Sequence, residues 1–128
     1  MVIALVCTAV LGVLIFGLGL AISIYRFMTK AYYVGADRPA AFTTKLSRAH
    51  GNTAEFGPML AILFLTLAAL GAPAWAEAAM IGATASRILV VIGFLTASTL
   101  EHISLPKAAG ALGTYGFGLA LTAALFLP

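Results

Sequence analysis

The chain has 128 residues, of which 62% are hydrophobic and only 9% are charged, and its mean hydropathy is +1.10. Soluble domains are about 45–50% apolar and about 25% charged, so this composition excludes an ordinary water-soluble fold and indicates an integral membrane protein. The net charge of +3 does not indicate a nucleic-acid partner, because most of the basic residues lie in one segment between two apolar runs. Cys7 is the only cysteine, so no internal disulfide can form.

The first predicted helix spans residues 2–27 and carries no charge before Arg26. Its apolar length is enough to cross a bilayer and exceeds that of the apolar part of a cleaved signal sequence, so we expect a retained transmembrane helix. Arg26 and Lys30 stand at its far end, where long basic side chains can extend to the membrane interface.

The second predicted helix spans residues 44–70 and follows a connection over residues 29–44. Its first third is polar, whereas residues 59–70 are apolar apart from one threonine. Pro58 lies inside this helix, where it removes one backbone hydrogen bond and favours a kink.

Two further helices are predicted, over residues 74–98 and 107–126. The third helix contains a single basic residue, Arg87, near its middle. The four helices together predict one transmembrane domain over residues 1–128, which is an all-α integral membrane four-helix bundle.

The distribution of lysine and arginine predicts the orientation of the bundle. Most basic residues lie in or beside the first connection, the third connection adds Lys107, and the second connection has none. Basic connections face the cytoplasm. With four spans, both chain termini are then expected on the opposite side of the membrane.

The polar start of the second helix holds the main candidates for a functional site. Arg48, Asn52 and Glu55 are spaced i, i+4 and i+7, so they share one helix face. His50 points in another direction, toward a neighbouring helix or subunit. A charged group at the centre of a membrane helix costs about 2.5–3.5 kcal/mol. We therefore expect Glu55 to pair with Arg87, the only basic residue at depth on another helix.

This polar set supports two interpretations. In the first, it is a structural ion pair at the polar start of a helix. In the second, it forms a pocket that opens at the cytoplasmic interface, where the arginines bind carboxylates and Asn52 and Glu55 bind an amine or amide. Such a pocket suits a small zwitterionic ligand with more than one carboxylate.

Residues 48–55 read Arg-Ala-His-Gly-Asn-Thr-Ala-Glu and are followed by Pro58 and an apolar run. This segment resembles the helix 2 signature of the MAPEG family, R-A-H-x-N-x-x-E, whose members are membrane-associated proteins in eicosanoid and glutathione metabolism. Arg87 and Gly93 resemble the arginine and glycine of the family's third helix. The likeness is to the short bacterial members, so it implies a homotrimer of four-helix subunits and a location in the bacterial inner membrane.

The resemblance also implies a function, which is that of a membrane-bound glutathione-dependent transferase or peroxidase acting on lipophilic electrophiles. Glutathione, the co-substrate, is expected at the subunit interface near the cytoplasmic side. The partners implied are membrane lipid, a small hydrophobic substrate and two further copies of the chain. Carried over by position, the residues expected to contact glutathione are Arg26, Arg48, His50, Asn52, Glu55 and Arg87.

The chain departs from the family pattern where thiol chemistry is expected. Many glutathione-using members have a His or Tyr three residues after the third-helix arginine and a Tyr seven residues after it, but this chain has Val90 and Phe94. A nearby cation or hydroxyl donor is needed to activate a thiol. The candidates in this chain are the cations of Arg87 and Lys107 and the hydroxyl of Tyr115.

Two alternatives to an enzyme stay open at this point. One is a non-catalytic lipid- or glutathione-binding membrane protein of the same family, which the missing polar groups at Val90 and Phe94 favour. The other is a structural subunit with a purely architectural ion pair. No metal site is predicted, because His50 and His102 are far apart and no Cys–His spacing is present.

Overall fold

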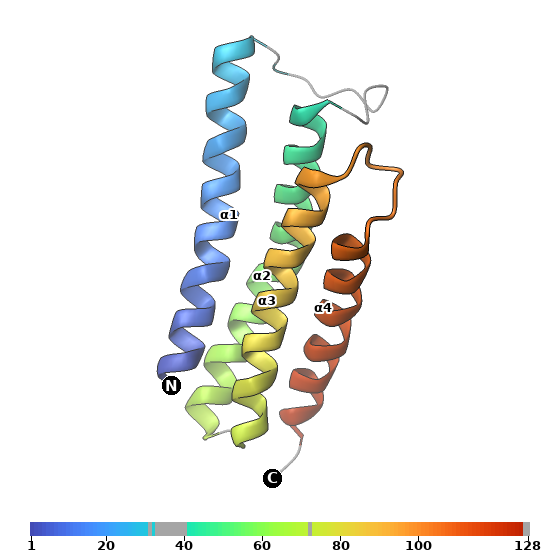
Figure 1. Cartoon of the computed structure of the whole chain (residues 1–128). Helices are drawn as coiled ribbons and strands as arrows, with labels where there is room; N and C mark the ends of the chain where they lie inside the picture. Colours follow the sequence, from blue (N-terminus) through green and yellow to red (C-terminus); the bar gives the residue numbers. More distant parts are fainter. Residues whose placement is uncertain (31, 33–40, 72, 127–128) are drawn as a thin grey trace.

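The computed structural model describes residues 1–30, 32, 41–71 and 73–126, and in these ranges the chain forms four α-helices. Their bounds are Val2–Thr29 (α1), Phe42–Leu70 (α2), Ala74–Thr96 (α3) and Leu105–Ala124 (α4). The four helices run side by side in an elongated bundle (Figure 1). The start of α1, the turn from α2 to α3 and the end of α4 lie at one end of the bundle. The expected all-α bundle of four helices is therefore confirmed.

The helix limits follow from local chemistry. Gly71 ends α2 in the left-handed conformation (φ 74°), which glycine adopts without the steric penalty of a side chain. Its backbone N–H donates to the carbonyl oxygen of Leu67. Pro106 lies in the first turn of α4, where the missing N–H is not needed. This helix begins at Leu105, two residues before the predicted start. Inside α2, the helix continues through Pro58 to Leu70.

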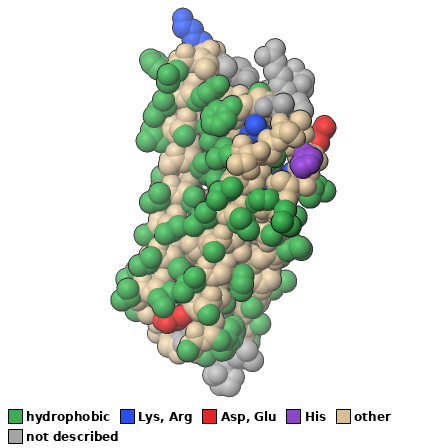
Figure 2. Space-filling model, viewed as in Figure 1, with side chains coloured by type: hydrophobic (Ala, Val, Ile, Leu, Met, Phe, Trp, Pro, Cys, Tyr) green, Lys and Arg blue, Asp and Glu red, His purple; other side chains and the backbone are tan. Residues whose placement is uncertain are grey.

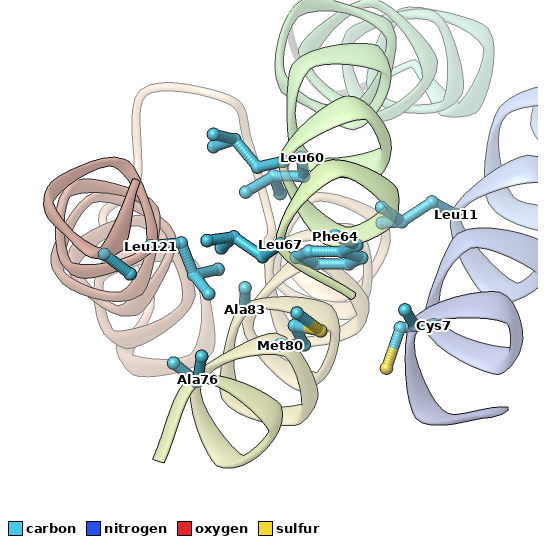
Figure 3. Close-up of a cluster of buried hydrophobic side chains, with 13 residues drawn as sticks. Cys7, Leu11, Leu60, Phe64, Leu67, Ala76, Met80, Ala83 and Leu121 are labelled. Atoms are coloured by element: carbon cyan, nitrogen blue, oxygen red, sulfur yellow. The ribbon is translucent and has the colours of Figure 1, made fainter. Parts of the chain in front are cut away.

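One end of the bundle has a purely apolar core to which all four helices contribute. Leu11 of α1 points toward Phe64 of α2, Cys7 of α1 and Met80 of α3 lie on one side of that ring, and Leu121 of α4 lies beside Leu67 of α2 (Figure 3). Phe64 and Leu121 are 0% exposed. Lipid offers little hydrophobic drive for helix association, so close van der Waals packing of this kind holds the helices together.

Helices α3 and α4 approach each other most closely, and glycines make this possible. A Cβ atom built on Gly93 would lie 2.5 Å from the backbone nitrogen of Lys107. A Cβ atom on Gly110 would lie 2.7 Å from the carbonyl oxygen of Ser86. Small residues at such positions let two membrane helices touch along their backbones.

The surface of the bundle suits lipid. Large hydrophobic side chains are exposed along it, including Phe16, Phe27, Leu112 and Leu119, and Figure 2 shows hydrophobic side chains over the whole length of one face. In the described residues, the helices α1, α2 and α3 are long and apolar enough to cross a membrane. Helix α4 is 20 residues long and is not among these three, so its crossing of the membrane stays a prediction.

Candidate functional site

The polar face of α2 carries an ion pair that differs from the expected one. The side chains of Arg48 and Glu55 meet at 3.5 Å between Nη1 and Oε1, and they are 51% and 53% exposed. Both side chains are long enough to span the two helical turns between them. Glu55 is thus paired along its own helix, and the predicted ion pair between Glu55 and Arg87 is not formed, so that prediction was wrong.

Arg87 of α3 is held by neutral groups instead. Its side chain is 1% exposed. Nη2 donates to Oδ1 of Asn52 over 2.7 Å, and Nη1 donates to Oγ1 of Thr114 over 3.4 Å. The guanidinium also lies over the ring of Phe56, 5.2 Å from its centroid, at the range of a cation–π contact. Arg87 therefore joins α3 to α2 and α4, while its Nε atom is buried without a hydrogen-bond partner among the described residues.

The bond to Arg87 fixes the orientation of the Asn52 amide. A guanidinium can only donate hydrogen bonds, so the amide must present its oxygen to Arg87. The amide NH2 of Asn52 is consequently left for another partner, and among the described hydrogen bonds it has none. Asn52 can therefore donate to a carboxylate or carbonyl oxygen, rather than accept from an amine as the sequence suggested.

Arg26 of α1 and His50 of α2 lie together between these two helices, on the side of α2 that faces α1. A Cβ atom on Gly19 of α1 would lie 3.2 Å from Cε1 of His50, which shows how close the imidazole is to α1. A cavity of about 280 Å³ opens here and is lined by Gly19, Ile22, Ser23, Arg26, Ser47 and His50. In the described part of the chain, Arg26 Nε, Ser47 Oγ and His50 Nδ1 are buried polar atoms without partners. The six predicted contact residues therefore form two groups on different sides of the subunit.

The polar face of α2 leads into an apolar groove between α2 and α4. Phe56 packs edge-on against Tyr115, with ring centroids 5.6 Å apart. A groove of about 160 Å³ begins at this pair and is lined by Phe56, Met59, Leu60, Leu63, Thr114, Tyr115, Gly118, Leu119 and Thr122. Sequence reasoning missed Phe56 and Thr114. The spacing of Phe56, four residues after Asn52, is the signal that places it on the same helix face.

The structure separates the three candidates for thiol activation. The ammonium group of Lys107 donates to the carbonyl oxygens of Leu100 (2.9 Å) and His102 (2.6 Å) and lies 5.7 Å from the ring centroid of Phe94. Lys107 thus stabilises the connection between α3 and α4. Arg87 and Tyr115, by contrast, line one small cavity next to Asn52.

The two positions of α3 where the family resemblance leads us to expect polar groups belong to the core. Val90 is 2% exposed and Phe94 is 8% exposed, and both pack in a second apolar cluster with Ala49 and Val91. These positions of α3 therefore supply no hydroxyl or imidazole.

A family model described as "MAPEG family" matches residues 4–127, which is nearly the whole chain. No curated protein and no solved structure shows a significant match to the chain.

Proposed function

The chain belongs to the MAPEG family of membrane proteins, which includes glutathione-dependent transferases and peroxidases, and on this premise we propose that it binds glutathione and conjugates it to lipophilic electrophiles. The observation that carries the proposal is the polar face of α2, where Arg48, Asn52 and Glu55 lead to the buried Arg87 and then to an apolar groove.

The chemistry of this face suits several groups of glutathione. Glutathione has two carboxylates, one ammonium, two amides and a thiol. The guanidinium of Arg48 can hold a carboxylate with two parallel hydrogen bonds, the carboxylate of Glu55 can hold the ammonium, and the free NH2 of Asn52 can donate to an oxygen. The exposed Arg48–Glu55 pair contributes only about 0–1 kcal/mol, so a zwitterionic ligand replaces it at little cost.

The separation of the six residues supports a site shared between subunits. Arg26 and His50 line the cavity between α1 and α2, whereas Glu55 pairs with Arg48, which does not line that cavity. In a head-to-tail ring, the α1 side of one subunit faces the α2–α4 side of the next subunit. Arg26 and His50 of the first subunit then complete the site on the polar α2 face of the second. Repeated around a closed ring, this contact gives a symmetric oligomer, and we propose the homotrimer that the family resemblance implies.

The same arrangement favours an orientation. Arg26, Lys45, Arg48 and Lys107 lie at or near the bundle end that is formed by the last turn of α1 and the first turns of α2 and α4. Basic ends face the cytoplasm. We therefore propose that glutathione enters from the cytoplasm and that both termini lie on the other side of the membrane, in a bacterial inner membrane as the resemblance implies.

A non-catalytic glutathione- or lipid-binding protein is the second candidate. The burial of Val90 and Phe94 in the apolar core favours it, because these α3 positions lack the polar groups that the family resemblance leads us to expect there. The two candidates agree on binding and differ only in turnover.

Two measurements on detergent-purified protein test the proposal. A ligand that binds only the folded state raises the unfolding temperature, so we expect glutathione to stabilise the wild type and not Arg48→Ala. Lys30→Ala is the control, because Lys30 is an exposed cation at the same end of the bundle. Formation of the glutathione conjugate of chlorodinitrobenzene then separates an enzyme from a binder. No stabilisation of the wild type at millimolar glutathione would contradict the proposal.

A further inference from the structure

The cavity between α1 and α2 is a cationic space within a single subunit. It measures about 280 Å³, and we call it the Arg26 cavity; it is lined by Gly19, Ile22, Ser23, Arg26, Ser47 and His50. One water molecule needs about 10–15 Å³, so this space admits a group of many atoms. None of its six lining residues is acidic.

We propose that the Arg26 cavity binds the phosphate of an anionic phospholipid, and that this lipid competes with glutathione for Arg26 and His50. The membrane around the protein then regulates the glutathione site. The competition rests on the proposed function, whereas the binding of the lipid does not.

The cavity has more donors than the protein itself uses. Nε of Arg26, Oγ of Ser47 and Nδ1 of His50 are buried and have no hydrogen-bond partner among the described residues. Buried polar atoms are nearly always paired, so three unpaired ones around one cavity indicate a ligand. A guanidinium and a hydroxyl donate to an oxyanion, and an imidazole donates from Nδ1 in one of its tautomers. The ligand is therefore an acceptor of hydrogen bonds.

The arrangement of the donors favours a phosphate. They come from two helices, Arg26 from α1 and Ser47 and His50 from α2. The oxygens of a phosphate surround a tetrahedral centre, so donors can approach them from several directions. A carboxylate accepts mostly within its own plane. Guanidinium contacts to either oxyanion are strong, so a carboxylate of glutathione uses the same donors but suits them less well.

The charges around the cavity favour an anionic lipid over a zwitterionic one. Arg26 is the charged residue that α1 contributes to the lining. On α2, the carboxylate of Glu55 pairs with Arg48 and does not line the cavity. A basic pocket between membrane helices attracts the headgroups of anionic lipids.

The depth of the cavity matches that of lipid phosphates. Helix α1 has 28 residues and is about 42 Å long, whereas the hydrocarbon core of a bilayer is about 30 Å thick. No charged residue precedes Arg26 in this helix, and Arg26 lies in its last turn. The end of α1 that carries Arg26 therefore emerges from the core into the headgroup region.

The surface beside the cavity suits the acyl chains of the same lipid. Phe16, Leu20 and Phe27 of α1 are exposed. They are spaced i, i+4 and i+11, so they share a helix face, and this face adjoins the one that lines the cavity. A lipid whose phosphate is held by Arg26 can lay its chains along these side chains toward the middle of the membrane.

The first test is thermal unfolding of the detergent-purified protein with short-chain phosphatidylglycerol and no glutathione. A ligand that binds only the folded state raises the unfolding temperature. We expect stabilisation of the wild type, and less from short-chain phosphatidylcholine, whose headgroup is neutral overall. Binding should be roughly tenfold weaker in Ser47→Ala, which loses one hydrogen bond to a charged group, and absent in Arg26→Ala. Lys30→Ala and Ser104→Ala change residues outside the cavity and are the matched controls.

The second test measures glutathione affinity in bilayer discs of phosphatidylcholine with and without phosphatidylglycerol. We expect phosphatidylglycerol to weaken glutathione binding to the wild type at least roughly tenfold, and to weaken it less in Ser47→Ala. General repulsion of glutathione by an anionic surface acts equally on both proteins. Equal weakening in the two would therefore overturn the competition.

The remaining outcomes separate this inference from the proposed function. Absence of stabilisation by phosphatidylglycerol, or equal stabilisation by phosphatidylcholine, overturns the anionic-lipid site. Equal stabilisation by inorganic phosphate assigns the cavity to a free anion and overturns the lipid as its ligand. Stabilisation by phosphatidylglycerol with unchanged glutathione affinity overturns the competition alone. Absence of glutathione binding in phosphatidylcholine discs overturns the proposed function and the competition, while thermal unfolding still decides the lipid site.

Discussion

Nη2 of Arg87 donates a hydrogen bond to Oδ1 of Asn52 over 2.7 Å, and this contact joins the buried cation of α3 to the polar face of α2. It holds the Asn52 amide with its NH2 group free for a ligand. It also leaves the charge of Arg87 without a carboxylate within ion-pair distance among the described residues. The contact therefore couples the stability of the bundle to the chemistry of the proposed site.

The variant Asn52→Asp tests this coupling. An aspartate in the place of Asn52 gives Arg87 a carboxylate partner, so we expect an unfolding temperature equal to or above that of the wild type. Glutathione affinity falls at least roughly tenfold, about 1.4 kcal/mol, because the NH2 donors are lost and Arg87 is neutralised. Thermal unfolding and glutathione titration measure the two effects. Wild-type affinity in this variant would show that Asn52 and Arg87 do not act on the ligand.

Replacing Arg87 by methionine separates a functional arginine from an architectural one. Apolar replacement of a buried charge is often neutral or stabilising, but it leaves Oδ1 of Asn52 unpaired, at a cost of about 1–3 kcal/mol. We expect Arg87→Met to fold with a loss of stability of no more than about 1–3 kcal/mol and to lose conjugation of chlorodinitrobenzene by at least about a hundredfold. Full activity in a folded variant would contradict the role given to Arg87.

The variant Glu55→Gln tests the ammonium contact. A hydrogen bond to a charged group contributes about 1.5–3 kcal/mol, so we expect glutathione to bind at least roughly tenfold more weakly, with little change in stability because Glu55 is half-exposed. Glu101→Gln, which changes another exposed carboxylate, serves as the control. Equal affinities in the two variants would remove Glu55 from the site.

Because α3 and α4 lie so close together, adding one methyl group at their contact is expected to lower the stability of the bundle. In Gly93→Ala the new Cβ atom meets the backbone of Lys107 at 2.5 Å, which backbone movement alone can relieve, so we expect a loss of stability of about 1–3 kcal/mol. Gly116→Ala is the control, because a Cβ atom there meets nothing within 4 Å. Thermal unfolding in detergent compares them, and equal destabilisation would contradict the contact.

The spacing of residues predicted the polar face of α2, but it did not predict the contacts that Arg87 makes with α2 and α4. The helical period placed Arg48, Asn52 and Glu55 on one face of α2 and turned His50 away from it, because these positions depend only on helix geometry. The meeting of Arg87 with Asn52 and Thr114 depends on the relative depth of three helices, which the period does not determine.

The wrong pairing of Glu55 has the same origin. Two long side chains can bridge two turns of one helix, and this local contact forms in place of the expected pairing with Arg87. The role of Lys107 was likewise not predictable, because it depends on how residues 97–104 connect α3 to α4. Residues 31 and 33–40 of the expected first connection lie outside the described residues, and so does its basic residue Arg38.

Mixed oligomers test whether the site is shared between subunits. Arg26→Ala and Arg48→Ala each remove one side of every site, so each variant alone should lose glutathione binding. In a head-to-tail ring of randomly mixed subunits, about a quarter of the interfaces regain both intact sides. Co-expression should therefore restore about a quarter of the wild-type binding. Two variants that never complement each other would contradict the shared site.

The most direct test of the central claim is equilibrium binding of radiolabelled glutathione to the detergent-purified wild type, Arg48→Ala and Lys30→Ala. We predict saturable binding to the wild type and to Lys30→Ala, and no saturable binding to Arg48→Ala at millimolar glutathione. Binding that survives unchanged in Arg48→Ala, or is absent from the wild type, would contradict a glutathione site on the polar face of α2.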